Sequence, residues 1–163
     1  MVPELPDDAS RLDRYFWARH ANPRSGWSRV ASTPLLMACI YRRNWRGLAL
    51  TVLFVLLNPV LFSPPEDDSA WMTRVVYGER LWTQDEHGHF SYPEILNVFN
   101  GIASLYAVYA AVKQRPAETA LATALSMALK FWFVAEMVHL YDDHVAESDR
   151  HSWLLADRLS SRG

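Results

Sequence analysis

The chain has 163 residues, of which 50% are hydrophobic and 13% aromatic, and its formal net charge is −2. This composition excludes intrinsic disorder, which requires few apolar residues and a high net charge. The balanced charge, without any basic block, argues against nucleic acid as a partner. A lone cysteine, Cys39, excludes an internal disulfide and a cysteine-based metal cluster.

The first thirty residues carry many polar and aromatic side chains and predict an interfacial segment. Ser10 and Asp13 have the spacing of a capping box, which predicts a helix from there to about His20. Aromatic and arginine side chains suit a helix lying flat at a membrane surface, although a short helix on a soluble core has the same pattern. The stretch HANPRSGWSR, residues 20–29, contains turn-forming residues and predicts a loop.

Two apolar runs follow and predict a first hairpin. The run from Ala31 to Tyr41 is short for the roughly 20 residues that cross a bilayer, so it is either extended by the preceding loop or re-entrant. The run from Gly47 to Phe62 is longer, and Asn58-Pro59 is expected to kink or end it.

The apolar runs at 95–112 and 118–143 predict a second hairpin. Each carries a stripe of small or polar residues at spacings of three and four, which lets membrane helices approach closely. The stripes consist of Asn97, Gly101, Ser104, Ala107 and Ala111 in the first run and of Ala120, Ala124 and Ala128 in the second. We therefore expect a close antiparallel pair.

The residues between and after the hairpins are mostly polar. A helix is expected from Ser69 to Trp82, and the tryptophans within it suit a membrane interface. Residues 84–92 are expected to form a loop. The tail after His144 is expected to form a short interfacial helix.

These elements predict an all-α fold, a small helical membrane bundle of three to four transmembrane helices with interfacial amphipathic helices. We expect a multi-pass protein of the cell membrane, with lipid as its partner. Residues 1–163 form a single domain in this prediction. Its parts are an interfacial segment at 1–30, a first hairpin at 31–62, a polar connection at 63–94, a second hairpin at 95–143 and a tail at 144–163. Mean hydropathy is −0.09, because the polar parts offset the apolar runs, and a soluble helical bundle with a ligand cavity is the alternative.

Basic residues predict the orientation of the hairpins. The turns at 42–46 and 113–116 are basic and the connection at 63–94 is mostly acidic, so the turns should be cytoplasmic. If the first apolar run spans the bilayer, the arginine-rich N-terminal residues lie outside, which conflicts with the enrichment of basic residues on the cytoplasmic side. A re-entrant or surface-lying first run would remove that conflict.

The stretch from Met127 to His144 combines apolar and ionisable residues, and we expect it to be the central helix of the bundle. A helical period separates its side chains into two opposite stripes. The stripes are Trp132, Glu136, His139 and Asp143 on one side and Lys130, Val134, Met137 and Tyr141 on the other. Polar groups on two faces predict neighbours on both sides.

Glu136 and His139 form a Glu-x-x-His pair, which can present two ligands to one metal, and Asp143 could extend such a site. A di-iron centre also needs a second such pair, which the sequence lacks. The other interpretation is that this Glu and His are held by polar neighbours. We predict no cofactor, and a membrane-embedded metal-dependent enzyme, similar to a hydroxylase or hydrolase, is the alternative function.

Lys130 lies in the middle of an apolar run, where a charge often marks a paired or functional position. Glu79 and Glu136 are its candidate partners. Lys130 could instead reach a surface or serve structure alone.

Further charged residues could form one polar network at a membrane face. Arg29, Glu79, Arg80 and Asp142 are its members, together with His20. A pair of arginines in that network could bind a lipid phosphate.

Several short motifs occur in a fixed order along the chain. They are HANPRSGWSR at 20–29, Asn58-Pro59-x-x-Phe62, Tyr77-Gly-Glu-Arg-x-Trp82, Lys130-x-Trp132-Phe133 and Met137-x-x-Leu-Tyr-Asp142. Their order resembles that of an uncharacterised family of small bacterial and archaeal multi-span membrane proteins with a HANPWSGWTR-like opening. The resemblance covers residues 17–143, with Arg24 where the family has Trp, and Glu136 and His139 are not part of the family pattern.

This resemblance implies a membrane protein without an assigned reaction. It directs attention to polar residues within the motifs, which we expect to form a polar cluster or ligand-binding site. They are His20, Asn22, Ser25, Arg29, Glu79, Arg80, Lys130, Tyr141 and Asp142. The function we predict is a non-enzymatic structural or lipid- or ligand-binding module, and the sequence leaves open a homo-oligomer or another membrane-protein partner.

Overall fold

The structure is a computed structural model, and it describes residues 11–84 and 92–160. These residues form six helices and no strand, so the predicted all-α fold is confirmed. The helices are α1 (Arg11–His20), α2 (Pro23–Tyr41), α3 (Trp45–Leu61), α4 (Trp71–Gln84), α5 (Tyr92–Val112) and α6 (Pro116–Ser160). The expected capping residue Ser10 and most of the expected loop at 84–92 lie outside the described residues.

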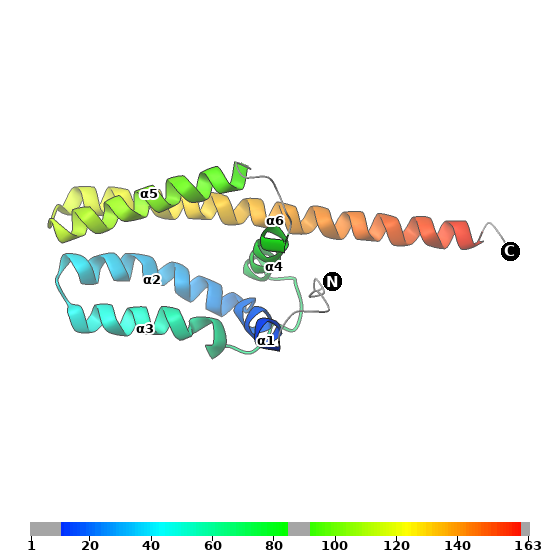
Figure 1. The fold of residues 1–163 in the computed structure, drawn as a ribbon, viewed down its shortest axis with the longest axis horizontal. Coiled ribbons are helices and arrows are strands. Elements are labelled where there is room, and N and C mark those ends of the chain that lie inside the picture. Colours follow the sequence, from blue (N-terminus) through cyan, green and yellow to red (C-terminus); the bar gives the residue numbers. More distant parts are fainter. Residues whose placement is uncertain (1–10, 85–91, 161–163) are drawn as a thin grey trace.

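Two helical hairpins lie side by side, and a layer of two shorter helices crosses one end of them (Figure 1). α2 pairs with α3, α5 pairs with α6, and α2 also contacts both helices of the second hairpin. Both hairpin turns lie at one end of the bundle, and α1 and α4 lie across the opposite end. The second half of α6 extends beyond this layer (Figure 1).

α2 begins within the stretch that was predicted to be a loop. The Asn22 side-chain oxygen accepts a hydrogen bond from the Arg24 backbone N–H at 2.8 Å, and Pro23 occupies the first helical turn. Asn and Pro are turn formers, but in this order they also start helices. The loop prediction is therefore wrong after Asn22. The first apolar run is extended at its N-terminal end into a continuous helix that ends at Tyr41.

The two hairpin turns share one backbone design. Arg43 and Gln114 have left-handed φ angles of 54° and 55°. The residues that follow, Asn44 and Arg115, each donate their N–H to the carbonyl five residues earlier. This pattern satisfies carbonyl groups at the end of the first helix and reverses the chain tightly. The predicted hairpins at 31–62 and 95–143 therefore both exist, with their basic turns at the same end.

α3 begins and ends at residues that the sequence marks. The Asn44 side-chain oxygen accepts a hydrogen bond from the Gly47 backbone N–H at 3.0 Å and caps the helix. α3 continues through Pro59 and ends at Leu61, so the proline lies in the last turn, close to where the helix was expected to end.

The close antiparallel pair of α5 and α6 is confirmed. Three residues of the predicted α5 stripe fit it, since Ala107 and Ala111 are buried and Ser104 bonds to Ser126, but on α6 other small residues are buried than those predicted. The small buried residues are Ala103, Ala107, Ala110 and Ala111 of α5 and Thr119, Ala122, Thr123 and Ser126 of α6. The predicted stripe of Ala120, Ala124 and Ala128 faces outward, and a side chain at Gly101 would meet open space. Small residues occur on two faces of α6, so their spacing alone does not identify the packed face.

α4 crosses α6 at Gly78, where the two backbones approach closely. A Cβ atom at this position would overlap the backbone carbonyl of Met137. Because Gly78 has no side chain, the apolar face of α4 packs closely against α6. The resulting core contains Met72, Val75, Leu96, Phe133, Val134, Met137 and Val138.

α6 is a single helix of 45 residues, so the prediction of a separate helix after His144 is wrong. The sequence between Asp142 and Ser160 has no Gly or Pro, and therefore no residue that would end the helix. The predicted stripes of α6 lie on opposite faces, since Met137 is buried and Trp132 is exposed. The stripe with Trp132 is largely exposed, although the Trp132 ring contacts Tyr92 at the start of α5 with 6.1 Å between centroids.

The hairpins place many large apolar side chains outside, and many of the side chains that they bury are small or polar. Outward-facing residues include Leu50, Leu53 and Leu56 of α3, Val98, Ile102 and Leu105 of α5, and Leu121 and Leu125 of α6. Buried polar residues include Ser25, Ser32, Thr51, Asn58, Thr119, Thr123 and Ser126. Two of the described helices, α5 and α6, are long and apolar enough to cross a membrane, and α3 is apolar but shorter.

Candidate functional site

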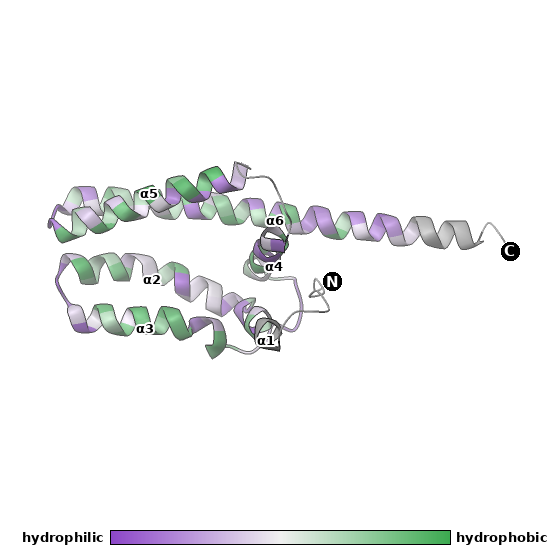
Figure 2. Cartoon of the chain, viewed as in Figure 1, coloured by the Kyte–Doolittle hydropathy of each residue, from purple (hydrophilic) through white to green (hydrophobic). Residues whose placement is uncertain are grey.

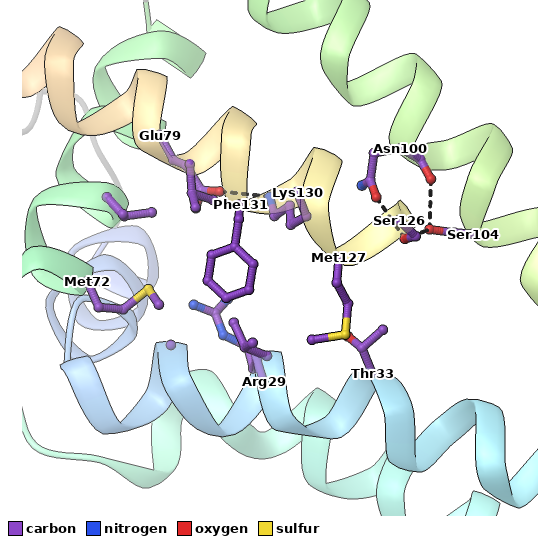
Figure 3. Close-up of a pocket in the computed structure, with 14 residues that line it drawn as sticks. Arg29, Thr33, Met72, Glu79, Asn100, Ser104, Ser126, Met127, Lys130 and Phe131 are labelled. Carbon is purple, nitrogen blue, oxygen red and sulfur yellow. Dashed lines mark hydrogen bonds and ion pairs between the residues drawn. The ribbon is translucent and has the colours of Figure 1, made fainter. Parts of the chain in front are cut away.

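A cavity of about 330 Å³ lies between α2, α4, α5 and α6 (Figure 3). Its charged end carries Arg29, Glu79 and Lys130, and its opposite, neutral end carries Asn100, Ser104 and Ser126. Apolar side chains line the rest, among them Val30, Met72, Val75, Met127, Phe131 and Val134. A mostly apolar cavity with a few polar groups is typical of a small-molecule site, and this volume is at the lower end of the usual range.

The charged end joins α2, α4 and α6. Lys130 Nζ lies 3.1 Å from Glu79 Oε1, which confirms one of the two partners expected for this lysine. The Lys130 ammonium also lies 4.4 Å from the centre of the Phe133 ring. Arg29 adds a second positive charge, so two cations and one carboxylate leave a net charge of +1 at this end.

His20 holds the Arg29 guanidinium. Arg29 Nη1 lies 2.8 Å from His20 Nε2. Because a guanidinium only donates, Nε2 accepts and the imidazole proton is assigned to Nδ1. The ring is buried and stacks on Phe16 with 5.0 Å between centroids. Burial, together with the charges of Arg29 and Lys130, lowers the pKa of His20 to about 3, so the ring is neutral at physiological pH.

The neutral end of the cavity joins α5 to α6. Ser126 Oγ donates to Asn100 Oδ1 at 2.9 Å and lies 2.7 Å from Ser104 Oγ. Figure 3 shows these three side chains clustered at one side of the cavity. They give the neutral end hydroxyl and amide groups, which can hydrogen-bond a ligand but do not attract an ion strongly.

Asn22 and Ser25 do not line the cavity. Besides capping α2, Asn22 donates from Nδ2 to the Ser63 carbonyl at 2.8 Å. Ser25 Oγ donates to Asn58 Oδ1 at 2.6 Å, and Asn58 Nδ2 donates to Ser28 Oγ at 2.7 Å. These bonds fasten α2 to α3, so the two predicted site residues have structural partners.

Tyr141 and Asp142 also lie outside the cavity. The Tyr141 hydroxyl donates to Asp68 Oδ2 at 2.6 Å, and Arg74 Nη1 lies 3.0 Å from Asp142 Oδ2. Arg80 is 4% exposed and burial lowers its pKa, but it does not line the cavity either. The single polar network expected from the sequence is thus divided, and only part of it surrounds the cavity.

A family model matches residues 7–157, and its description is a family of unknown function, DUF6653. The chain belongs to this family. The match confirms the predicted membership in an uncharacterised family. No curated protein and no solved structure matches the chain.

In this DUF6653 member, the predicted metal ligands lie on the outward face of α6. Glu136 Oε1 accepts a hydrogen bond from Trp132 Nε1 at 3.2 Å, and His139 and Asp143 are exposed. Among the described residues, no group of three or more His, Cys, Asp or Glu side chains could hold a metal ion. A metal site at Glu136 remains a prediction without a described cluster to support it.

The sequence analysis missed several residues of this DUF6653 cavity. Asn100 and Ser126 were not selected, although a polar side chain inside an apolar run was the signal that selected Lys130. Arg74 was also missed as the partner of Asp142. Met72 gave no signal, because a methionine in an amphipathic helix is ordinary core composition.

Proposed function

We propose that this chain is an integral protein of the cell membrane and a non-enzymatic lipid- or ligand-binding module. In this proposal α2, α3, α5 and the first half of α6 cross the bilayer, and α1 and α4 lie at one interface. The observation that carries the proposal is the distribution of side chains in the two hairpins, with large apolar side chains outside and many small or polar side chains inside.

The outer surface of the hairpins is unfavourable in water. Leu105 is 72% exposed and Leu121 is 71% exposed, and further large apolar side chains are exposed on α3, α5 and α6. Soluble monomers rarely expose apolar patches larger than a few hundred Å². In lipid the same surface costs nothing, because the surrounding acyl chains are as apolar as leucine.

The interior of the hairpins is typical of helices that pack in lipid. Ser32, Thr51 and Thr123 each donate a hydroxyl hydrogen bond to the carbonyl four residues earlier in their own helix. These bonds satisfy the hydroxyl groups without water, and the small side chains allow close helix contact. Such an interior buries little apolar surface, so it would supply a weak driving force for folding in water.

The helix lengths match a bilayer. α3, α2 and α5 have 17, 19 and 21 residues. At 1.5 Å per residue these lengths are about 26 to 32 Å, close to the roughly 30 Å of a hydrocarbon core. The basic turns at one end and the α1–α4 layer at the other would then lie in the two interfaces.

The cavity supports the binding role. It opens among the proposed membrane helices and combines a charged end with an apolar lining. Membrane lipids have the same two parts, a polar head and apolar chains, so lipid is the partner that this cavity fits best. The basic turns favour a cytoplasmic position for their end of the hairpins. The N-terminal arginines lie at the opposite end and favour the reverse orientation. Labelling from one side of the membrane decides between the two.

The test combines membrane extraction with labelling from one side. Cys39 is changed to Ser, and a new cysteine is placed by Arg42→Cys in the first turn or by Ser152→Cys near the end of α6. We expect the protein to resist an alkaline carbonate wash. An impermeant maleimide should label the two cysteines from opposite sides of sealed vesicles. Release by carbonate, or labelling of both cysteines from the same side, contradicts the proposal.

A further inference from the structure

We propose that the cavity binds a singly charged oxyanion carried on an apolar chain, and that Arg29 is the residue that recognises it. The oxyanion is a carboxylate or a phosphodiester, as found in fatty acids and in acidic phospholipids. This inference rests on the proposed function, because the membrane is the source of such molecules. It adds the chemical class of the ligand and the group that selects it.

The first argument is charge. Lys130 and Glu79 neutralise each other at 3.1 Å, whereas within the described part of the chain Arg29 forms a hydrogen bond only to the neutral His20. Glu79 also interacts electrostatically with Arg29, but one carboxylate balances only one of the two cations, so a net positive charge remains at this cavity wall. A partly buried charge is costly unless it is paired, and a bound oxyanion would supply the pair.

The second argument is the geometry of the guanidinium. Its Nη1 atom donates to His20 Nε2 at 2.8 Å, and its buried Nε atom has no hydrogen-bond partner among the described residues. A guanidinium has five N–H donors in a planar fork, and this fork suits the two oxygens of a carboxylate or phosphate. His20 therefore acts as a positioning residue, because it holds one nitrogen of the fork while other N–H groups of Arg29 form no hydrogen bond among the described residues.

The third argument is the composition of the remaining wall. Val30, Met127, Phe131 and Val134 give the cavity an apolar surface beside the charged end. Figure 3 shows Arg29, Phe131 and Met127 around the same space. Such a surface can pack against a hydrocarbon chain, but it offers no hydrogen bonds or charges to a free inorganic ion. Because the cavity holds about 330 Å³, we place in it the charged group and the first carbons, with the rest of the chain in the bilayer.

The same charges select against zwitterionic lipid. A choline group would need an anionic or aromatic partner next to the phosphate site. Glu79, the carboxylate at this end of the cavity, is already paired with Lys130, and the Phe131 ring lies in a wall whose net charge of +1 repels a second cation. Phosphatidylcholine is therefore expected to bind more weakly than phosphatidylglycerol, although both carry a phosphodiester.

The experiment measures binding of three probes to the full chain purified in detergent. The probes are oleate, dioleoyl phosphatidylglycerol and dioleoyl phosphatidylcholine, and native mass spectrometry reports the bound fraction at each lipid concentration. The variants are Arg29→Gln and, as the matched control on the same helix, Arg24→Gln at an exposed position. We expect Arg29→Gln to weaken binding of the acidic probes by about 10- to 100-fold, the size of a charged hydrogen-bonded contact, and Arg24→Gln to leave it unchanged.

A second variant keeps the test decisive if Arg29→Gln does not fold. Glu79→Gln removes the carboxylate at the charged end and leaves two cations there, so acidic probes should bind several-fold tighter. Binding of oleate alone identifies a fatty acid as the source, and binding of phosphatidylglycerol alone identifies a phospholipid head. Either result supports the oxyanion site.

Two results would overturn the inference. One is equal binding of phosphatidylcholine and phosphatidylglycerol together with no response to oleate. The other is unchanged binding of acidic probes in both Arg29→Gln and Glu79→Gln. Failure of the proposed function is seen separately, since a protein released by carbonate contradicts the membrane proposal whether or not it binds oleate in solution.

Discussion

The two halves of α6 expose opposite kinds of side chain although they belong to one helix. In the first half, Leu121 and Leu125 face outward while Thr123 and Ser126 are buried. In the second half, Asp142, Asp143 and other charged side chains are exposed. Figure 2 shows the same change along the helix, from a largely apolar part within the hairpin to a largely hydrophilic part beyond α4.

The proposed membrane accounts for this difference without any change in the backbone of α6. A continuous helix satisfies its own backbone hydrogen bonds in either solvent. Only the side chains must match the solvent, apolar outward in lipid and charged outward in water. The change occurs at the α4–α6 crossing, so this crossing marks the edge of the proposed membrane region.

The largest effect is expected where the two regions join. Gly78→Ala would place a methyl group against the Met137 carbonyl, and a helix backbone cannot move aside as a side chain can. We expect a loss of more than about 3 kcal/mol, at the upper end of overpacking effects, or failure to fold. Thermal unfolding of the detergent-purified protein measures it. Gly101→Ala is the control, because nothing lies within 4 Å of its added methyl group, and it should be neutral or slightly stabilising. Equal behaviour of the two variants would show that the close crossing is not needed.

The second largest effect is expected when a charge is added to the outer surface, because its cost should differ between the hairpins and the second half of α6. Ile102 is 58% exposed in the middle of α5, and Ile102→Arg would place a cation in lipid at a cost of about 2.5 to 3.5 kcal/mol. Trp153 is 67% exposed on the second half of α6, and Trp153→Arg should have little effect, because that half would lie in water. The measurement is the fraction of each variant that resists carbonate extraction. If the two substitutions reduce it equally, the outer surface of the hairpins does not meet lipid.

His20 provides a pH test of the layer at the end of the hairpins. Its folded pKa of about 3 lies below the ordinary value of 6.5, so between these values the unfolded chain takes up a proton that the folded protein does not. Stability is therefore expected to fall as the pH decreases from 6.5 toward 3, with a slope of at most about 1.4 kcal/mol per pH unit. Unfolding midpoints between pH 7 and 5 measure this slope. His20→Gln should remove most of it and the exposed His139→Gln should keep it, and the opposite result would place the titrating group elsewhere.

The smallest effect is expected for the ion pair of the exposed layer. Arg74 and Asp142 lie 3.0 Å apart with side chains that are 32% and 47% exposed. Exposed pairs contribute roughly 0.2 to 1 kcal/mol, and salt reduces the contribution further. A double-mutant cycle with Arg74→Gln and Asp142→Asn measures the coupling. A coupling above about 2 kcal/mol would show that this pair is shielded from water, and the second half of α6 would then need a covering partner.

The features that could be predicted from the sequence depend on neighbours along the chain. Opposite stripes on α6 follow from the period of a helix, so Met137 and Tyr141 were correctly separated from Trp132. A charge in an apolar run needs a partner, and Glu79, one of the two candidates named for Lys130, is the partner that the structure shows. The start of α2 was wrongly predicted as a loop, because Asn22-Pro23 suits both a turn and the first residues of a helix. The hydrogen bond of Asn22 to the Ser63 carbonyl favours the helix.

The residues that could not be predicted depend on which helix faces meet. The face that α6 turns to α5 was misassigned, because Ala120 and Thr119 are both small and only packing against Ala107 and its neighbours distinguishes them. Arg80 of α4 and Asp142 of α6 were grouped with Arg29 because all three are charged. Only Arg29 lines the cavity. The cavity could not be predicted for the same reason. Its walls come from four helices, and no local sequence pattern determines how these helices are rotated relative to one another.

By itself the sequence determined the all-α class, the two hairpins with basic turns and the division into apolar and polar segments, because these follow from periodicity, capping and composition. Tertiary structure alone decided the crossing at Gly78, the buried faces and the pairing of Arg29 with His20, and so placed one net positive charge beside an apolar cavity. The physical reason is that close packing depends on the shapes of surfaces far apart in the chain, where one missing Cβ atom sets the position of a whole helix.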